Sequence, residues 1–284
     1  MCAVLDVSRS GYYAWRTRPA SAREMADADY VQEIRRIFTD SRETYGYESV
    51  WRVMQAEEQG CGKHRARRLM RQEGLVVKQV KRYKRTTKAN PEHQPAPNVL
   101  EGDFAADRPD AKWCGDITYI PTQEGWLYLA VILDLFSRRI VGWAMAARMT
   151  QELVCTALRM AVRQRQPTGP LLHHSDRGSQ YTGQAFQALL TAHGITPSMS
   201  GRGNCYDNAP VESFFGTLKT ELVNHAVYRT RQEAMTDIFF YLEGFYNRSR
   251  RHTALDHLSP AAFEAQYESI LVRQRSEFVS INSG

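Results

Sequence analysis

The chain has 284 residues, of which 43% are hydrophobic and 24% are charged, and this balance excludes an intrinsically disordered protein. Its most apolar run, residues 126–133, is far shorter than the roughly 20 residues that span a bilayer, so no membrane association is expected. Five scattered cysteines and an N-terminus without a secretory signal predict reduced thiols and a cytoplasmic location.

The net charge of +6 is unevenly distributed along the chain. Residues 1–100 contain 19 Lys+Arg and 12 Asp+Glu, a balance of +7, whereas residues 101–284 contain 18 and 19, a balance of −1. Because Lys and Arg neutralise phosphates, this asymmetry favours a nucleic-acid-binding N-terminal region joined to a nearly neutral body.

Two helical segments are predicted before residue 78. Residues 1–20 form a short segment in which Ser8 caps a helix with an aromatic face, and the sequence leaves open whether that face packs or contacts DNA. In residues 21–77, apolar residues recur at helical spacing on both sides of Gly60-Cys61-Gly62. This spacing predicts two amphipathic helices joined by a turn, a helix-turn-helix-like DNA-binding module.

Cations on the outer face of the second of these helices are predicted DNA contacts, since a recognition helix meets a DNA groove. A plain helical hairpin without DNA contact is the alternative. Cys61 and His64 lie close together, but no second Cys/His pair at zinc-finger spacing accompanies them, so a zinc site is not expected. The predicted contacts are Lys63, Arg65, Arg67, Arg68 and Arg71.

Residues 78–105 have the composition of a basic, proline-rich linker. Cations come first and three prolines follow within residues 90–98, which favours an extended chain able to lie along a DNA backbone. The linker residues expected to contact DNA are Lys81, Arg82, Lys84 and Arg85.

From residue 106 the pattern changes to strands. Residues 113–121, 126–133 and 139–145 are rich in β-branched, aromatic and aliphatic residues, which predicts three antiparallel strands. A helix over 150–164, a strand ending near 172–173, a helix over 184–193 and a strand over 195–199 follow. This order predicts an α/β catalytic core over residues 106–225, with a mixed five-stranded sheet like that of ribonuclease H, and a C-terminal helical segment over 226–284.

Three acidic residues in distinctive phrases are the candidate catalytic and metal-binding site. Asp116 lies within the first predicted strand, Asp176 just beyond the fourth, and Glu212 in the first turn of a helix entered through residues 207–210. Clustered carboxylates repel one another unless a cation joins them. Their oxygens suit Mg²⁺, with Mn²⁺ as a substitute, and two ions about 3.5–4 Å apart would serve phosphodiester chemistry.

Lys219 follows Glu212 by seven residues, two helical turns, and is therefore expected on the same helix face. A cation there is a predicted DNA contact near the scissile phosphate, and a solvated lysine is the alternative. His173 and His174 could assist a metal site, although histidines at a strand end more often pack or form hydrogen bonds.

Several short sequence motifs resemble those of one family in order and spacing. The chain resembles the second-frame (OrfB) transposases of the IS-three family over about residues 45–265, a family whose catalytic core is similar to retroviral integrase. Cys114-Gly115 departs from the family's more usual valine-threonine. The matching phrases are Asp116-Ile117-Thr118-Tyr119, His174 to Tyr181, Gly203 to Ala209, Glu212-Ser213-Phe214-Phe215, Leu218-Lys219 and Phe245-Tyr246-Asn247-Arg248.

The resemblance implies an Asp-Asp-Glu DNA transposase, a polynucleotidyl transferase that cuts and joins strands at insertion-sequence ends. It implies metal-ligand roles for Asp116, Asp176 and Glu212, and as partners the terminal inverted repeats, target DNA and at least one further copy of the chain on nucleoid DNA. Family members often act as a fusion with an upstream-frame (OrfA) product, whose leucine-zipper heptads do not occur here. A ribonuclease H-like nuclease that only hydrolyses and a domesticated DNA-binding regulator are the alternatives.

Overall fold

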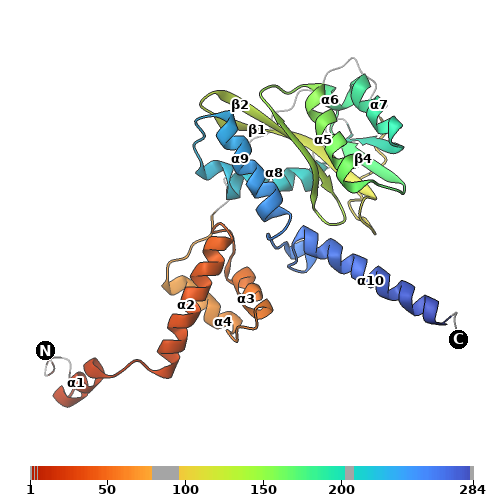
Figure 1. Cartoon of the computed structure of the whole chain (residues 1–284). Helices are drawn as coiled ribbons and strands as arrows, with labels where there is room; N and C mark the ends of the chain where they lie inside the picture. The colour runs from red at the N-terminus through yellow and green to blue at the C-terminus, as the bar shows by residue number, and fades with distance from the viewer. Residues whose placement is uncertain (1, 3, 5, 79–95, 202–207, 282–284) are drawn as a thin grey trace. The chain divides into compact units, whose positions relative to one another are not determined.

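A computed structural model of the chain describes residues 2, 4, 6–78, 96–201 and 208–281. Contacts within the chain divide it into two compact units, residues 1–78 and residues 79–284. The first unit is helical and the second contains a β-sheet (Figure 1).

Four helices lie within the described residues of the first unit. Ser8 caps the first of them, its hydroxyl accepting a hydrogen bond from the Gly11 backbone N–H, as predicted, and no residue of this helix is buried. Ser21 and Glu24 form a capping box at the start of the second. The helices are α1 (Arg9–Thr17), α2 (Ala22–Asp40), α3 (Tyr47–Ala56) and α4 (Lys63–Gln72).

Helices α2, α3 and α4 share a small hydrophobic core. Val50 and Met54 of α3 and Ala66 and Leu69 of α4 are buried in it, and Ile34 of α2 completes the cluster. The spacing that predicts two amphipathic helices around a glycine-containing turn is therefore confirmed, and α2 supplies the surface on which both helices pack.

A mixed five-stranded sheet forms the centre of the second unit, with strand order β3-β2-β1-β4-β5. The first three strands pair antiparallel, and β4 and β5 add in parallel to β1 and β4, so the predicted ribonuclease H-like α/β fold is confirmed. The strands are β1 (Lys112–Thr122), β2 (Gly125–Asp134), β3 (Ile140–Ala146), β4 (Leu171–Ser175) and β5 (Ile195–Met199).

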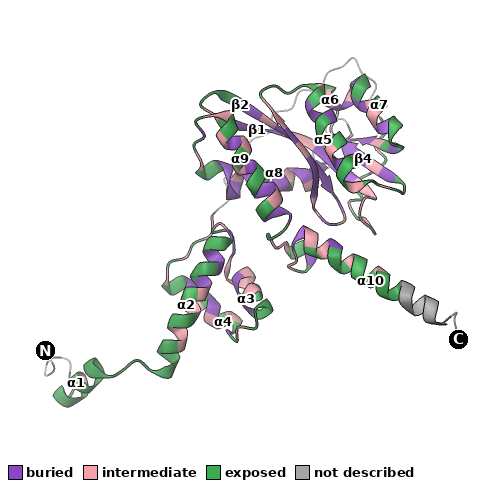
Figure 2. Ribbon diagram, viewed as in Figure 1, coloured by how far each residue is buried: buried purple, intermediate pink, exposed green. Residues whose placement is uncertain are grey.

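Helices cover both faces of this sheet (Figure 1). One face packs on α5 and α7, and a side chain at Gly142 of β3 would overlap the Ala157 carbonyl, so glycine allows α5 this close approach. The other face packs on α8, α9 and the π-helix η3. Figure 2 shows the sheet buried between them. The elements are α5 (Gln151–Arg165), α6 (Ser179–Thr182), α7 (Gln184–Ala192), α8 (Ala209–Glu221), α9 (Arg231–Phe239) and η3 (Phe240–Tyr246), with short 3₁₀ turns at η2 (Val223–His225) and η4 (Thr253–Leu255).

The C-terminal helix α10 (Pro260–Ile281) is tied to the sheet by buried charges. Glu264 accepts hydrogen bonds from Arg165, Arg139 and Ser137, and Arg165 also donates to Asp110. Beyond this anchor α10 is mostly exposed as far as its side chains are described (Figure 2). Among the described residues, no helix has both the length and the apolarity that a membrane span requires.

Candidate active site and DNA-contact residues

The strand register brings Asp116 and Asp176 together. β1 pairs in parallel with β4 from Lys112↔Leu172 to Gly115↔Ser175, where the pairing ends. Asp116 is the next residue of β1, and Asp176 is the first residue after β4. Two residues 60 positions apart in the chain are thus placed at one edge of the sheet, as the sequence predicts for acids on neighbouring strands.

Tyr181 lies close enough to sense both aspartates. This tyrosine is buried, and burial raises the pKa of its hydroxyl well above its usual value. The negative charges of Asp116 and Asp176 raise that pKa further. Tyr181 is therefore a buried neighbour of both carboxylates.

A tight loop holds Asp176. Its Oδ1 accepts a hydrogen bond of 2.9 Å from the Gly178 backbone N–H. A Cβ at residue 178 would come within 2.9 Å of the same oxygen, so a larger residue here would displace the Asp176 carboxylate. Arg177, between them, donates to the Ser200 carbonyl at 2.6 Å and fixes the loop to the end of β5.

Glu212 lies on α8, the helix that begins beside β1. Pro210 stands at the N-terminus of this helix and Glu212 lies in its first turn, as predicted. The buried Asn208 side chain, at the helix N-cap, donates to the Gly115 carbonyl at 3.4 Å, so the helix starts beside the residue that precedes Asp116. The sequence pattern assigned no role to Asn208 or Tyr181, although both stand within the matching phrases.

Lys219 lies two turns further along α8 and points toward β1. Its Nζ is 4.8 Å from the centroid of the Tyr119 ring. Partial burial lowers the pKa of the ammonium group, while Tyr119 and Asp116 oppose that shift. The cation therefore lies near the strand that carries the first aspartate, where a phosphate could meet it.

The donor set at this site is made of hard carboxylate oxygens, which are the ligands Mg²⁺ prefers. Asp116 and Asp176 are adjacent, and Glu212 stands at the helix start tied to Gly115. Within the described ranges, no three His, Cys, Asp or Glu side chains converge closely enough to enclose one ion. The residues present fit a divalent cation by their chemistry and by the proximity of the two aspartates.

The two histidines at the end of β4 are packed inside the core. His174 lies between Ser198 and Ser200, with ring nitrogens 2.9 and 3.2 Å from their hydroxyls. His173 contacts the rings of Tyr181 and Phe186, and burial lowers its pKa to about 3. Both histidines therefore pack or form hydrogen bonds inside the core, as histidines at a strand end more often do.

Gly115, which departs from the more usual threonine, makes room for one of these histidines. A Cβ at this position would lie 2.8 Å from Nε2 of His173 and 3.5 Å from the Tyr181 ring. Because His173 is enclosed and cannot move aside, a larger residue would displace the strand that carries Asp116.

The cations of α4 differ in their surroundings. Arg65 and Arg68 both donate to Asp27 of α2, at 2.7 and 2.8 Å, and Lys63 pairs with Glu48 of α3. Arg67 lies over the Tyr47 ring at 5.3 Å. Among the described residues, Arg67 and Arg71 take part in no ion pair.

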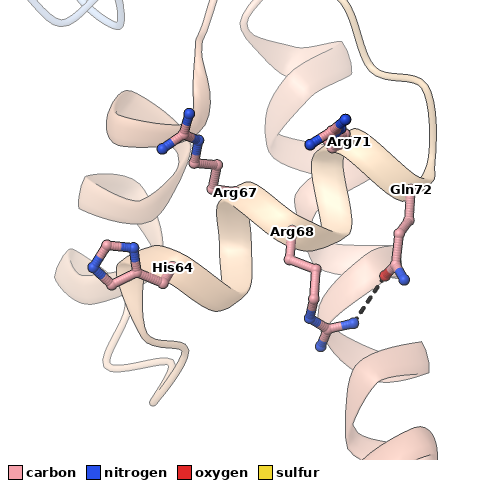
Figure 3. A pocket seen from close by; sticks show the side chains of 5 residues that line it. All are labelled: His64, Arg67, Arg68, Arg71 and Gln72. Atoms are coloured by element: carbon pink, nitrogen blue, oxygen red, sulfur yellow. Dashed lines mark hydrogen bonds between the residues drawn. The ribbon is translucent and has the colours of Figure 1, made fainter.

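Arg67 and Arg71 also line an open hollow of about 640 Å³ on α4, together with His64, Arg68 and Gln72 (Figure 3). In this view Arg68 turns toward Gln72, to which it donates a hydrogen bond of 2.8 Å. The surface most open to a phosphate on this helix is therefore the one formed by Arg67 and Arg71.

The remaining predicted contacts, Lys81, Arg82, Lys84 and Arg85, lie outside the described residues. Cys61 is buried in the core of the helical unit, and burial raises the pKa of its thiol. A thiol in that setting is a packing residue.

Comparisons with known proteins cover most of the chain. Residues 24–83 match a family described as an HTH-like domain, and residues 106–205 and 212–267 match two families described as an integrase core domain. The chain is 44% identical over 270 residues to the "Insertion element IS600 uncharacterized 31 kDa protein" of Shigella sonnei, covering 95% of this chain and 99% of that one. It is 40% identical over 267 residues to "Transposase InsF for insertion sequence IS3A" of Escherichia coli (strain K12), covering 93% and 92%.

A chain of the simian T-cell lymphotropic virus intasome, solved in complex with PP2A regulatory subunit B56 gamma, is also similar. It shares 18% identity at a TM-score of 0.48, covering 78% of this chain and 70% of that chain.

Proposed function

Since this chain belongs to the IS3 family of insertion-sequence transposases, we propose that Asp116, Asp176 and Glu212 are its catalytic acids and metal ligands. The observation that carries this assignment is the end of the β1–β4 pairing at Gly115↔Ser175, directly after which both aspartates lie. The hydrogen bond from Asn208 to the Gly115 carbonyl joins the start of α8, the helix that bears Glu212, to β1.

The reaction proposed is cleavage followed by strand transfer at the ends of the element. A water oxygen forms a bond to phosphorus while the bond to the 3′ oxygen breaks, which leaves a 3′-hydroxyl on the element. That hydroxyl then forms a new bond to phosphorus in a second phosphodiester, whose own 3′ oxygen leaves. The first step replaces an ester oxygen on phosphorus by a water oxygen, and the second replaces one ester oxygen by another, so neither needs an external energy source.

Each residue of the site has one role in this scheme. The three carboxylates would hold Mg²⁺, or Mn²⁺ in its place, and we propose two ions for each site, which supply Lewis acidity at the phosphate when bound. Lys219 would bind a phosphate oxygen beside the reacting one and orient the strand. Tyr181 and His173 are buried and their rings are in contact, and we propose that this packing supports the strand ends that carry the two aspartates.

The N-terminal unit would bring the DNA to this site. We propose that Arg67 and Arg71 of α4 contact phosphates of the terminal inverted repeats, with Lys63, Arg65, Arg68 and the linker cations in support. Joining two ends of one element to target DNA requires both ends at once, so we propose at least a dimer on DNA. An upstream-frame (OrfA) product is a further proposed partner.

Substitution Glu212→Gln tests the assignment. It keeps the size of the side chain and removes its charge, so we expect binding to labelled terminal repeats to be unchanged and Mg²⁺-dependent joining to fall by at least about 10³-fold, the scale expected when a catalytic group is removed. Joined and cut products are separated on a denaturing gel. Glu268→Gln on the exposed part of α10 is the matched control and should join DNA like the unaltered protein.

The gel also separates the alternatives. Persistent joining by the Glu212→Gln variant would refute the assignment. Cut but never joined ends in the unaltered protein would identify a nuclease that only hydrolyses. Specific binding of the repeats with neither product, in Mg²⁺ and in Mn²⁺, would identify a DNA-binding regulator.

A further inference from the structure

Two aromatic side chains meet at the hairpin that joins β1 and β2. The rings of Tyr119 and Trp126 are in edge-to-face contact, with centroids 4.9 Å apart and an interplanar angle of 76°. Tyr119 pairs with Tyr128 across the ladder, so Trp126, two residues from Tyr128, lies on the same face of the sheet. Trp126 is 49% exposed, whereas Trp113 of β1 is fully buried, so the Trp126 indole does not fill the core.

This pair is continuous with the candidate active site. The Nζ of Lys219 lies 4.8 Å from the Tyr119 ring centroid, so one aromatic ring contacts both the indole and the cation. Asp116 lies three residues before Tyr119, about 10 Å along the strand and, by the same alternation, on the opposite face of β1, so Lys219 is the residue that links the aromatic pair to the site. A nucleic-acid strand whose phosphate meets Lys219 would therefore carry neighbouring bases past Tyr119 and Trp126.

The hairpin that carries the pair is fixed in place. Arg231, at the start of α9, donates from Nε to the Trp126 carbonyl at 3.0 Å, and its backbone N–H donates to the Glu124 carboxylate at 2.9 Å. Within the turn, the Thr122 hydroxyl donates to the Gly125 carbonyl at 2.6 Å. A ligand at Trp126 would thus meet a surface that is already ordered, which reduces the entropic cost of binding.

We propose that Tyr119 and Trp126 form a stacking surface for an unpaired base of the DNA, next to the candidate catalytic acids. This inference rests on the proposed function, because it concerns the strand that enters that site. The occupant follows from chemistry: an exposed indole face beside a cation matches a base joined to a phosphate. Bases inside a duplex are stacked on both sides and the terminal pair offers only one face, whereas an unpaired base can stack on this surface directly.

Binding of tailed DNA tests the proposal. Duplexes that end in a short single-stranded tail, with 2-aminopurine in the tail, are titrated with the full chain in EDTA, so that affinity is measured without catalysis. We expect the unaltered protein to quench the probe and to prefer tailed over blunt DNA. Trp126→Leu should weaken tailed binding about tenfold, within the range for removal of one stacked base, and leave blunt binding unchanged.

Two further variants complete the design. Trp126→Phe keeps an aromatic face and should recover most of the tail preference. Phe240→Leu removes an exposed aromatic ring elsewhere in the same unit and should change nothing. Equal thermal midpoints of all variants would show that each is folded.

The outcomes separate this inference from the proposed function. Tail binding by Trp126→Leu equal to that of the unaltered protein would overturn the stacking surface, even if Mg²⁺-dependent joining proceeds. A change of oligomeric state in Trp126→Leu without any change in tail binding would also overturn it, in favour of a protein interface. If Trp126→Leu loses the tail preference and the unaltered protein never joins DNA, the stacking surface would stand and strand transfer would be refuted.

Discussion

The helical unit and the sheet-containing unit use charged side chains in different ways. In the helical unit, the pairs of Asp27 with Arg65 and Arg68 lie partly exposed at the surface. In the sheet-containing unit, Glu221 with Arg250 and Glu264 with Arg165 are largely buried. Exposed pairs contribute little to stability, whereas breaking a buried pair is strongly destabilising. A count of cations in the sequence therefore gives only the charge of a region. Whether a charged side chain positions an element or binds a ligand depends on how far it is buried.

The largest expected effect comes from breaking a buried pair. Arg250 donates to both carboxylate oxygens of Glu221 on α8, and the Tyr241 hydroxyl donates to the same group at 2.6 Å. Arg250→Met would leave Glu221 buried without its cation. We expect the free energy of unfolding to fall by about 3–5 kcal/mol, measured by urea denaturation.

An exposed pair on the next helix is the control for this change. Arg229 and Glu233 form an ion pair four residues apart at the start of α9, and the Arg229 side chain is 77% exposed. Arg229→Met should leave the free energy of unfolding almost unchanged. Equal decreases for the two variants would remove the distinction between buried and exposed pairs.

The next effect is a pH dependence that arises in the sheet-containing unit. Burial raises the pKa of Asp134 to about 6, although backbone N–H groups of Ser137 and Asp110 oppose the shift. A raised folded pKa stabilises the fold below the ordinary value of 3.8, and that contribution disappears as the pH rises through about 6. The decrease is on the order of 3 kcal/mol, at about 1.4 kcal/mol for each pH unit.

Asp134→Asn tests this dependence, because asparagine stays neutral. Between about pH 4 and pH 7, the unaltered protein should lose stability relative to the variant in urea denaturation. Asp29→Asn, at an exposed position of α2, should leave the pH dependence of stability unchanged. A constant difference between the unaltered protein and Asp134→Asn at all pH values would contradict the prediction.

The smallest effect concerns DNA affinity in the helical unit. Replacing Arg67 and Arg71 together by Ala should lower the magnitude of the slope of log affinity against log salt by about 0.9 for each phosphate that the two arginines neutralise. Replacing Arg65 and Arg68 should change that slope less but destabilise the unit, since Asp27 would be left without either arginine. Equal slope changes for the two double variants would show that the ion pairs with Asp27 do not keep Arg65 and Arg68 from contacting DNA.

Most of the fold follows from local patterns in the sequence. The strands β1, β2, β3 and β5 and the helices α5 and α7 begin within a few residues of their predicted positions, because runs of apolar and β-branched residues and helical spacing are local signals. The fourth strand ends at Ser175, slightly beyond its predicted end, and the short helix α6 was not predicted. The caps at Ser8 and the first-turn position of Glu212 are local in the same sense.

Contacts between distant residues could not be predicted in this way. Asp27 lies 38 residues from Arg65, and no spacing in α4 indicates that its inner arginines turn toward α2. Arg165 and Glu264 are 99 residues apart, and Asn208 and Gly115 are 93 apart. The candidate acids could be identified from the short sequence motifs around them. The register that makes Asp116 and Asp176 neighbours depends on strand pairing, which these motifs do not indicate.

The short pairing of β1 with β4 has a consequence for how such a chain can change over evolution. Four residue pairs, ending at Gly115↔Ser175, set the placement of Asp116 relative to Asp176. The chain between these acids makes its turns elsewhere in the sheet-containing unit. Insertions and deletions in those turns can therefore accumulate while the two aspartates keep their separation, and descendants of one ancestor can differ widely in length between them without moving either carboxylate.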